Sequence, residues 1–288
     1  MAGADKTYTP FDSLIAGRPL TPVPWQSDGT FQPDYELLEQ LLAVPLDTGS
    51  GAVPTALDVW VAQELRRAGF EEDVVWPRRV APRVLSRDLV LVERALAGSL
   101  PPKLKNPLKG SVEARVLGEF YEKQIDVLMA HWDRGAELMV STKTQLGSYG
   151  KNLHNRFEEY VGDIRNLRGR FPMASMGVLH LVHSNIDGES GAWDFTVDMM
   201  RKLQLEPQGY DTTCVLLAHW EGGSGPVQLR LDRTPEDLSA TKFFSKLIHA
   251  LLDRTPITVH PKARGMMPGA AAASSEVLEE LLGDSDDE

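Results

Sequence analysis

Cysteine is almost absent from this chain. Its 288 residues include one, Cys214, inside the apolar run "CVLLAHW". A disulfide within the chain is therefore excluded, and such cysteine usage is typical of a reducing cytoplasm. We expect Cys214 to pack as a small hydrophobic residue rather than to act as a nucleophile.

Long apolar runs are also missing. No uninterrupted run approaches the roughly 20 residues that span a bilayer, and the opening "MAGADKTYTPFDS" lacks the apolar segment of a signal peptide. Hydrophobic residues make up 42% of the chain and aromatic residues 7%, which is an ordinary globular balance. We therefore expect a soluble, cytoplasmic protein with no membrane partner.

Basic residues are missing from one end of the chain. Residues 266–288 hold seven acids and no base, which leaves only −4 of the net charge of −11 for the other 265 residues. We predict an acidic, disordered tail over residues 263–288. Residues 76–109, in contrast, carry eight Arg or Lys against two acids. A polyanionic partner is therefore compatible with the charge distribution.

The basic segment supplies candidate DNA contacts. We select Arg78, Arg79 and Lys105 as residues that face phosphate groups. The alternative is that these side chains form an ordinary solvated face.

The first third of the chain is predicted to be irregular and then helical. Residues 1–33 are rich in Pro, Gly, Asp and Thr and indicate an N-terminal arm. Residues 34–110 form a helical, partly basic region that ends in a proline-rich linker. Its helices are expected at 33–44, at 55–70 with Thr55 as N-cap, and at 86–98.

Residues 111–262 are predicted to form an α/β (α+β) domain. The expected order is helix 111–124, strands 125–132 and 136–144, helix 152–167, strand 176–184, helix 192–205, strands 210–220 and 227–232, and a helix from Pro235 with Thr234 as N-cap. This order predicts a mixed β-sheet flanked by helices. His180 and His183 on its buried strand point to opposite faces, which argues against a shared zinc ion.

One lysine stands near the end of an otherwise apolar strand. A hairpin turn at Asp133–Gly135 places Asp126 opposite the Ser141–Lys143 region of the partner strand. A buried lysine costs several kcal/mol unless a carboxylate or a ligand compensates its charge. Asp126 and Lys143 therefore form either a structural ion pair or a site for a metal ion and a phosphate group.

The segment after this strand carries a recognisable pattern. Its elements are Lys143, Gln145, Gly147, Ser148, Tyr149, Gly150, Asn152, Asn155, Arg156, Glu158 and Glu159. With the helix, hairpin and following helix around it, this pattern resembles the PD-(D/E)xK restriction-endonuclease superfamily. Over about 30 residues it is similar to the type II restriction enzymes that cut at CTCGAG.

The resemblance implies a restriction-endonuclease-like fold and a Mg²⁺-dependent nuclease site, in which Mn²⁺ substitutes for Mg²⁺. Asp126 would hold the metal and Lys143 would orient the attacking water, assisted by Ser141 and Gln145. DNA contacts would come from Lys151, Asn152, Asn155 and Arg156. A homodimer would cut both strands of double-stranded DNA, in restriction–modification or phage defence.

Ser141 departs from the family pattern, which has Glu or Asp two residues before the lysine. Some members of the superfamily carry Ser-x-Lys and take this carboxylate from the following helix. Spacing from Lys143 favours Glu158 as the metal ligand, whereas the stripe of Asn152, Arg156, Glu159 and Asp163 favours Glu159.

Two functions therefore stay open. The first is an endonuclease with a helix-borne carboxylate. The second is a catalytically inactive nuclease-fold module that binds DNA or another protein, because Ser141 replaces the usual acid.

Overall fold

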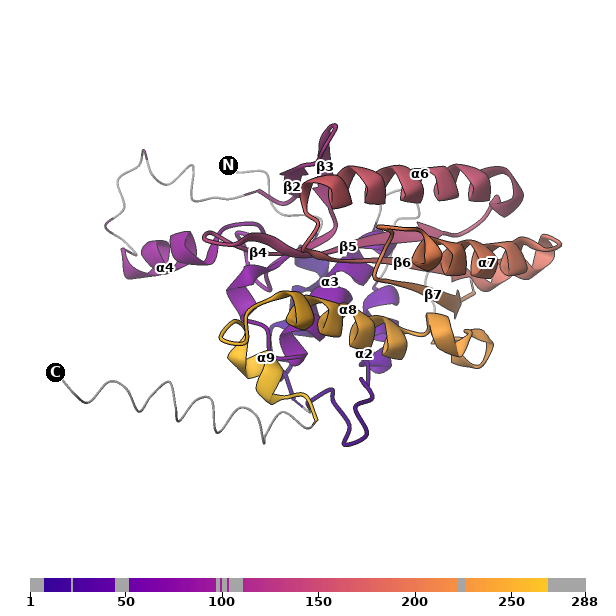
Figure 1. The fold of residues 1–288 in the computed structure, drawn as a ribbon. Coiled ribbons are helices and arrows are strands. Elements are labelled where there is room, and N and C mark those ends of the chain that lie inside the picture. The colour runs from indigo at the N-terminus through magenta and orange to yellow at the C-terminus, as the bar shows by residue number, and fades with distance from the viewer. Residues whose placement is uncertain are drawn as a thin grey trace.

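The computed structural model describes residues 8–21, 23–44, 52–96, 99, 103, 111–221 and 226–268 (Figure 1). A six-stranded mixed sheet in the order β1-β4-β5-β6-β7-β8 lies between helices. The predicted class, a mixed α/β sheet flanked by helices, is confirmed. Among the described helices, none combines the length and the apolar character that a bilayer crossing requires.

The strand direction changes three times across the sheet. Its strands are β1 (Val75–Trp76), β4 (Val127–His131), β5 (Gly135–Gln145), β6 (Ser175–His183), β7 (Thr212–His219) and β8 (Gln228–Leu229). β5, β6 and β7 run parallel, while β1, β4 and β8 are antiparallel to their neighbours. β6 is buried along almost its whole length, as its continuous apolar sequence predicts for a central strand.

Two layers of helices cover the sheet (Figure 1). α6 (Tyr149–Arg170) and α7 (Ala192–Leu205) pack on one face, and α2 (Tyr35–Leu42), α3 (Ala52–Arg67) and α8 (Ala240–Arg254) lie on the other. The other α-helices of the described residues are α1 (Asp12–Ile15), α4 (Arg87–Ala95) and α9 (Pro261–Gly265).

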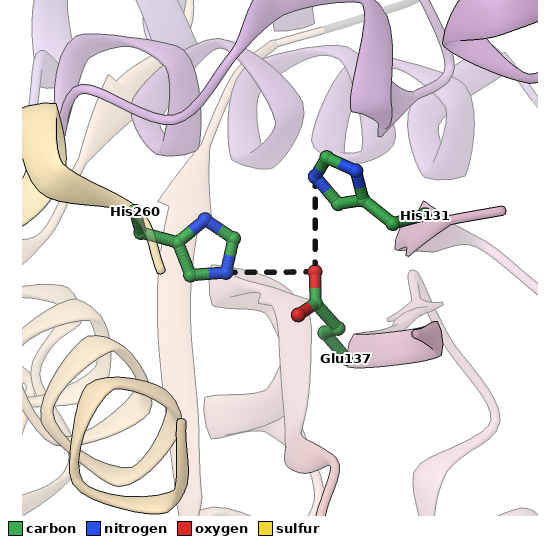
Figure 2. A group of neighbouring side chains, drawn as sticks. All are labelled: His131, Glu137 and His260. Carbon is green, nitrogen blue, oxygen red and sulfur yellow. Dashed lines mark ion pairs between the residues drawn. The ribbon is translucent and has the colours of Figure 1, made fainter. Parts of the chain in front are cut away.

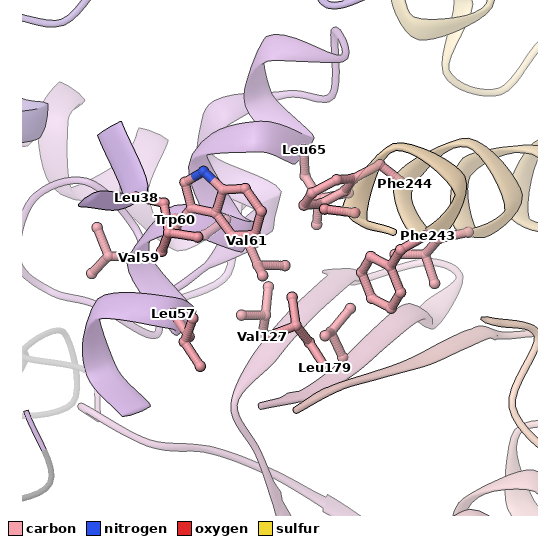
Figure 3. Close-up of a cluster of buried hydrophobic side chains, with 14 of the residues drawn as sticks. Leu38, Leu57, Val59, Trp60, Val61, Leu65, Val127, Leu179, Phe243 and Phe244 are labelled. Atoms are coloured by element: carbon pink, nitrogen blue, oxygen red, sulfur yellow. The ribbon is translucent and has the colours of Figure 1, made fainter. Parts of the chain in front are cut away.

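The larger core lies between α3, α8 and the sheet (Figure 3). Trp60 of α3 is fully buried, and its ring meets Phe244 of α8 edge-on at a centroid distance of 5.3 Å. Val127 and Leu179 of the sheet belong to the same cluster. α3 is buried almost all round, as a helix in the interior of a large core is. The N-terminal helices therefore share one core with the sheet.

The helix predicted at 111–124 is wrong. These residues form a hairpin of β2 (Ala114–Leu117) and β3 (Glu122–Ile125). Its turn is held by Asn166 of α6, whose side chain accepts hydrogen bonds from the N–H groups of Phe120 and Tyr121 at 2.8 and 3.2 Å. This contact from a distant part of the chain overrides the local helix propensity.

Some predicted boundaries also shift. α8 begins at Ala240 and not near Pro235, because Ser239 rather than Thr234 caps it by accepting from the Lys242 N–H at 3.3 Å. Thr55 lies inside α3, which starts three residues earlier than predicted. The strand predicted at 227–232 is shorter than expected, because only the two residues of β8 are paired in the sheet.

The N-terminal arm is more ordered than expected where it is described. The described part of the N-terminal arm contains α1 and buries Phe11, Trp25 and Phe31 in the larger core. Residues 269–288 of the predicted acidic tail lie outside the described residues.

Asn166→Ala should destabilise the protein by about 2 kcal/mol, because it removes three hydrogen bonds of a buried side chain, two accepted from N–H groups of the β2–β3 turn and one donated to the Tyr121 carbonyl. Urea unfolding measures this change. Asn155→Ala on the exposed face of the same helix is the control and should change stability by less than about 0.5 kcal/mol. Equal effects of the two variants would contradict the role given to Asn166.

Candidate active site

Asp126 lies at the bend between β3 and β4, beside the end of β5. Val127 pairs with Val140, so the next position along the hairpin brings Asp126 to Ser141. The Asp126 Oδ2 accepts hydrogen bonds from the Thr142 N–H at 2.9 Å and from the Ser141 hydroxyl at 3.2 Å. The predicted pairing of Asp126 with this part of β5 is confirmed.

Lys143 faces α6 and forms an ion pair there. Its Nζ lies 3.0 Å from the Glu159 Oε1. Burial lowers the pKa of Lys143, but Asp126 and Glu159 outweigh this effect and raise it above the usual value. Burial likewise opposes ionisation of Glu159, yet Lys143 and Arg156 hold the pKa of Glu159 below its usual value. Both groups are therefore charged at neutral pH.

The two candidate glutamates of α6 point in different directions. Glu159 contacts Lys143 through one carboxylate oxygen and Arg156 through the other. Glu158 is exposed on the other flank of the helix. Of the two residues, the structure brings Glu159 to the lysine.

A second buried aspartate lies here that the sequence analysis did not select. Asp58 of α3 is 7% exposed, and its Oδ1 accepts a hydrogen bond of 2.5 Å from the Thr142 hydroxyl. Thr142 therefore joins Asp58 and Asp126, one through its side chain and one through its N–H. A lone acid inside the apolar stretch "TALDVWVA" was the available signal.

The environment of both aspartates disfavours their charged forms. Burial raises the pKa of Asp58 well above the usual value, and the nearby Asp126 raises it further. Burial also raises the pKa of Asp126, although Lys143 opposes the shift. Two such carboxylates are a donor set that a divalent cation would stabilise.

Carboxylate oxygens are the kind of ligand that Mg²⁺ prefers. Mg²⁺ is typically held by one or two carboxylates, with waters and substrate phosphates completing its coordination. Among the described residues, no third His, Cys, Asp or Glu completes a group with Asp58 and Asp126 whose ligand atoms all lie within 4.8 Å of one another.

A polar pocket of about 450 Å³ opens beside the Lys143–Glu159 pair. Gln145, Asn152, Asn155, Arg156 and Glu159 are among its lining residues. The carboxamide nitrogen of Gln145 donates to the Ser148 carbonyl at 3.4 Å, while its buried Oε1 makes no hydrogen bond. Lys151 is exposed in the first turn of α6. The pocket thus presents several donors where α6 begins.

Arg78 and Arg79, two of the DNA contacts predicted from the basic segment, bind other parts of the protein instead. Arg78 is 3% exposed and pairs with Asp73 at 2.7 Å. Arg79 donates to carbonyl groups of Ile15, Ala16 and Arg18. These two guanidinium groups hold the protein together internally, so their assignment as phosphate contacts is corrected. Lys105 lies outside the described residues.

His180 lies next to Lys143 on the neighbouring strand of the sheet. It is the partner of Lys143 in the parallel pairing of β5 and β6, and it is fully buried against Tyr160. Burial lowers the pKa of His180 to about 3, so the ring is neutral at pH 7. A neutral, buried neighbour strengthens the interaction between Lys143 and Glu159.

No family model, curated protein or solved structure matches this chain. Its function is therefore inferred from its own residues and their geometry.

Asp58→Asn should stabilise the protein relative to wild type increasingly as the pH rises above the ordinary aspartate pKa of 3.8. The unfolded chain ionises Asp58 near 3.8, whereas the folded protein keeps it protonated to higher pH. The contribution of Asp58 to the stability of the wild-type protein therefore falls as the pH rises between its unfolded and folded pKa values, by up to about 1.4 kcal/mol per pH unit, and asparagine removes this loss. Urea unfolding in chelator measures the difference.

Asparagine keeps an acceptor for the Thr142 hydroxyl, so the hydrogen bond itself survives. Asp253→Asn, at an exposed position on α8, is the matched control and should show no such pH dependence. A constant difference between Asp58→Asn and wild type across the pH range would contradict the raised pKa.

Proposed function

We propose that this protein is a Mg²⁺-dependent DNA endonuclease of the restriction-endonuclease type. One observation carries the proposal: a buried carboxylate, Asp126, is hydrogen-bonded to the strand segment that bears Lys143, and Lys143 is charged and paired with Glu159. Phosphodiester hydrolysis requires an activated water and stabilisation of the charge that develops on the phosphate oxygens. An acid and a lysine at one strand end supply groups for both needs.

Each residue has a distinct task in this proposal. Asp126, with Asp58 beside it, would hold the Mg²⁺ ion, which acts as a Lewis acid when bound. Lys143 donates hydrogen bonds to the attacking water or to a phosphoryl oxygen. Glu159 keeps the ammonium group of Lys143 in place, and the Ser141 hydroxyl orients Asp126.

The fold supports the same proposal. The β4–β5 hairpin, α6 and β6 follow one another in the order that the resemblance to PD-(D/E)xK enzymes implies. Within it, the end of β5 and the start of α6 lie at the polar pocket, where Asn152, Asn155 and Arg156 can contact the DNA backbone or bases. We further propose a homodimer, with one site for each strand, acting in the cytoplasm in restriction or phage defence.

An inactive nuclease-fold module is the second candidate. It is favoured by the engagement of Glu159 with two cations, Lys143 and Arg156, which leaves neither carboxylate oxygen unpaired. Together with Ser141 in the usual acidic position, this arrangement would suit DNA or protein binding without hydrolysis.

Asp126→Asn, Lys143→Ala and Glu159→Ala should each abolish Mg²⁺-dependent cleavage while DNA binding persists. The reason is that these groups act on the metal, the water or the lysine rather than on distant phosphates. Cleavage of plasmid DNA with and without CTCGAG sites, methylated and unmethylated, measures activity, and gel shifts in Ca²⁺ measure binding.

Glu158→Ala is the matched control, because it removes the same group from the adjacent, exposed position, and it should cleave normally. Wild-type cleavage that survives Asp126→Asn or Lys143→Ala would overturn the assignment. Binding by wild type without cleavage of any DNA would instead favour the inactive module.

A further inference from the structure

Two histidines and a glutamate meet at the other end of the β4–β5 hairpin (Figure 2). His131 ends β4, Glu137 lies near the start of β5, and His260 directly precedes α9. Their ligand atoms all lie within 4.8 Å of one another. Both imidazole Nε2 atoms face the same carboxylate oxygen, the Glu137 Oε2, at 3.9 Å from His131 and 3.5 Å from His260.

A β-bulge turns Glu137 toward the histidines. Met129 pairs with Leu138 and Ala130 pairs with Ala136, so Glu137 is the extra residue that has no partner on β4. Bulges redirect a side chain away from the regular alternation of a strand, and they are common next to functional sites. Six residues separate Glu137 from Lys143, which is roughly 20 Å along a strand. The cluster is therefore separate from the candidate active site.

His260 has an unsatisfied nitrogen at the centre of this cluster. Its side chain is 6% exposed, and its Nε2 makes no hydrogen bond despite facing Glu137. Its backbone is also left-handed, with φ of +58°, a conformation in which non-glycine residues are uncommon. A buried nitrogen that makes no hydrogen bond, although it lies 3.5 Å from a buried carboxylate oxygen, is a feature that a bound cation would explain.

We propose that His131, Glu137 and His260 bind a transition-metal ion, Zn²⁺ in the first place. Imidazole nitrogens with one carboxylate oxygen are a common ligand set for zinc, and Mg²⁺ is disfavoured by the nitrogen donors. Tetrahedral zinc with bonds of about 2.1 Å places its ligand atoms about 3.4 Å apart. The two histidine–glutamate distances of 3.5 and 3.9 Å are close to this value, and the two histidine nitrogens lie within 4.8 Å of each other.

Arg134 donates hydrogen bonds to the Glu137 carboxylate. Its Nε donates to the Glu137 Oε1 at 2.7 Å, and its Nη2 donates to the Oε2 at the longer distance of 3.4 Å. Such contacts to a ligand fix its orientation and are typical of metal sites.

The two histidines of the cluster also line a cavity. His131 and His260 line a pocket of about 750 Å³ together with Phe70, Asp73 and Lys262. Three protein ligands with an accessible fourth position are characteristic of zinc sites that hold a water molecule or an exchangeable anion. The ion would also tie α9 to the hairpin.

Cobalt substitution tests the site in the full-length protein. After treatment with a chelator, Co²⁺ should bind at one equivalent with the visible absorption of a four- or five-coordinate ion, and added Zn²⁺ should displace it. His131→Gln, Glu137→Gln and His260→Gln should each weaken binding at least about tenfold. His249→Gln, at an exposed histidine on α8, is the control and should bind as wild type does.

A ligand exchange separates coordination from folding. His131→Cys should still bind Co²⁺ and add the near-ultraviolet absorption of a cobalt–thiolate bond, which wild type lacks because Cys214 is buried. Circular dichroism without metal checks that each variant folds. The proposal is overturned if wild type binds no Co²⁺ at micromolar concentration, or if binding is equal in the three Gln variants and the control. Neither result depends on DNA cleavage, so this test and the nuclease test fail separately.

Discussion

The register of the β4–β5 hairpin determines where every candidate functional group lies. Val127 opposite Val140 places the Asp126 carboxylate within reach of the Thr142 N–H. A slip of one residue would turn Lys143 from α6 toward α3 and bring Thr142 to the place of the lysine, because side chains alternate along a strand. The apolar residues of β5 prevent this slip, since Leu138 and Met139 belong to different cores on the two faces.

The same alternation explains how a lysine can occupy a largely buried strand. Lys143 turns toward α6, where Glu159 pairs with it, and the nearby Asp126 adds a second negative charge. Burying an unpaired ammonium group costs several kcal/mol, so removal of either partner would be far more harmful than loss of a surface ion pair. Thr142 turns the other way and reaches Asp58. One strand thus connects charged groups from both helical layers.

Local sequence patterns were sufficient for the hairpin, α6 and the central strand β6. The turn at Asp133–Gly135 lies between two apolar runs, and α6 has a regular apolar stripe, so local physics determines both. The β2–β3 hairpin could not be predicted in this way, because Asn166 lies more than 40 residues from the turn it holds. The same limit hid Asp58, which is 84 residues from Thr142.

The histidine cluster shows a different limit of prediction. His131 and Glu137 are close in sequence, but only the bulge brings their side chains to one point. His260 arrives from the segment between α8 and α9, and no spacing rule links it to the hairpin. Zinc motifs are recognisable in sequence when their ligands sit at fixed short spacings, and this group has none.

The cost of burying Asp58 and Asp126 is the strongest physical argument for a ligand at the candidate active site. A fold under selection for stability alone would place apolar or amide side chains there, since the raised pKa of Asp58 means that its ionised form destabilises the folded state. Ser141 donates its hydroxyl to Asp126 and brings no third charge into this space. A glutamate at position 141 would place another carboxylate beside the buried Asp126, and their mutual repulsion would add to the burial cost. Ser141 and Asp58 therefore have one explanation in the proposed nuclease: Asp58 of α3 supplies the second acid, and position 141 of the strand does not need one.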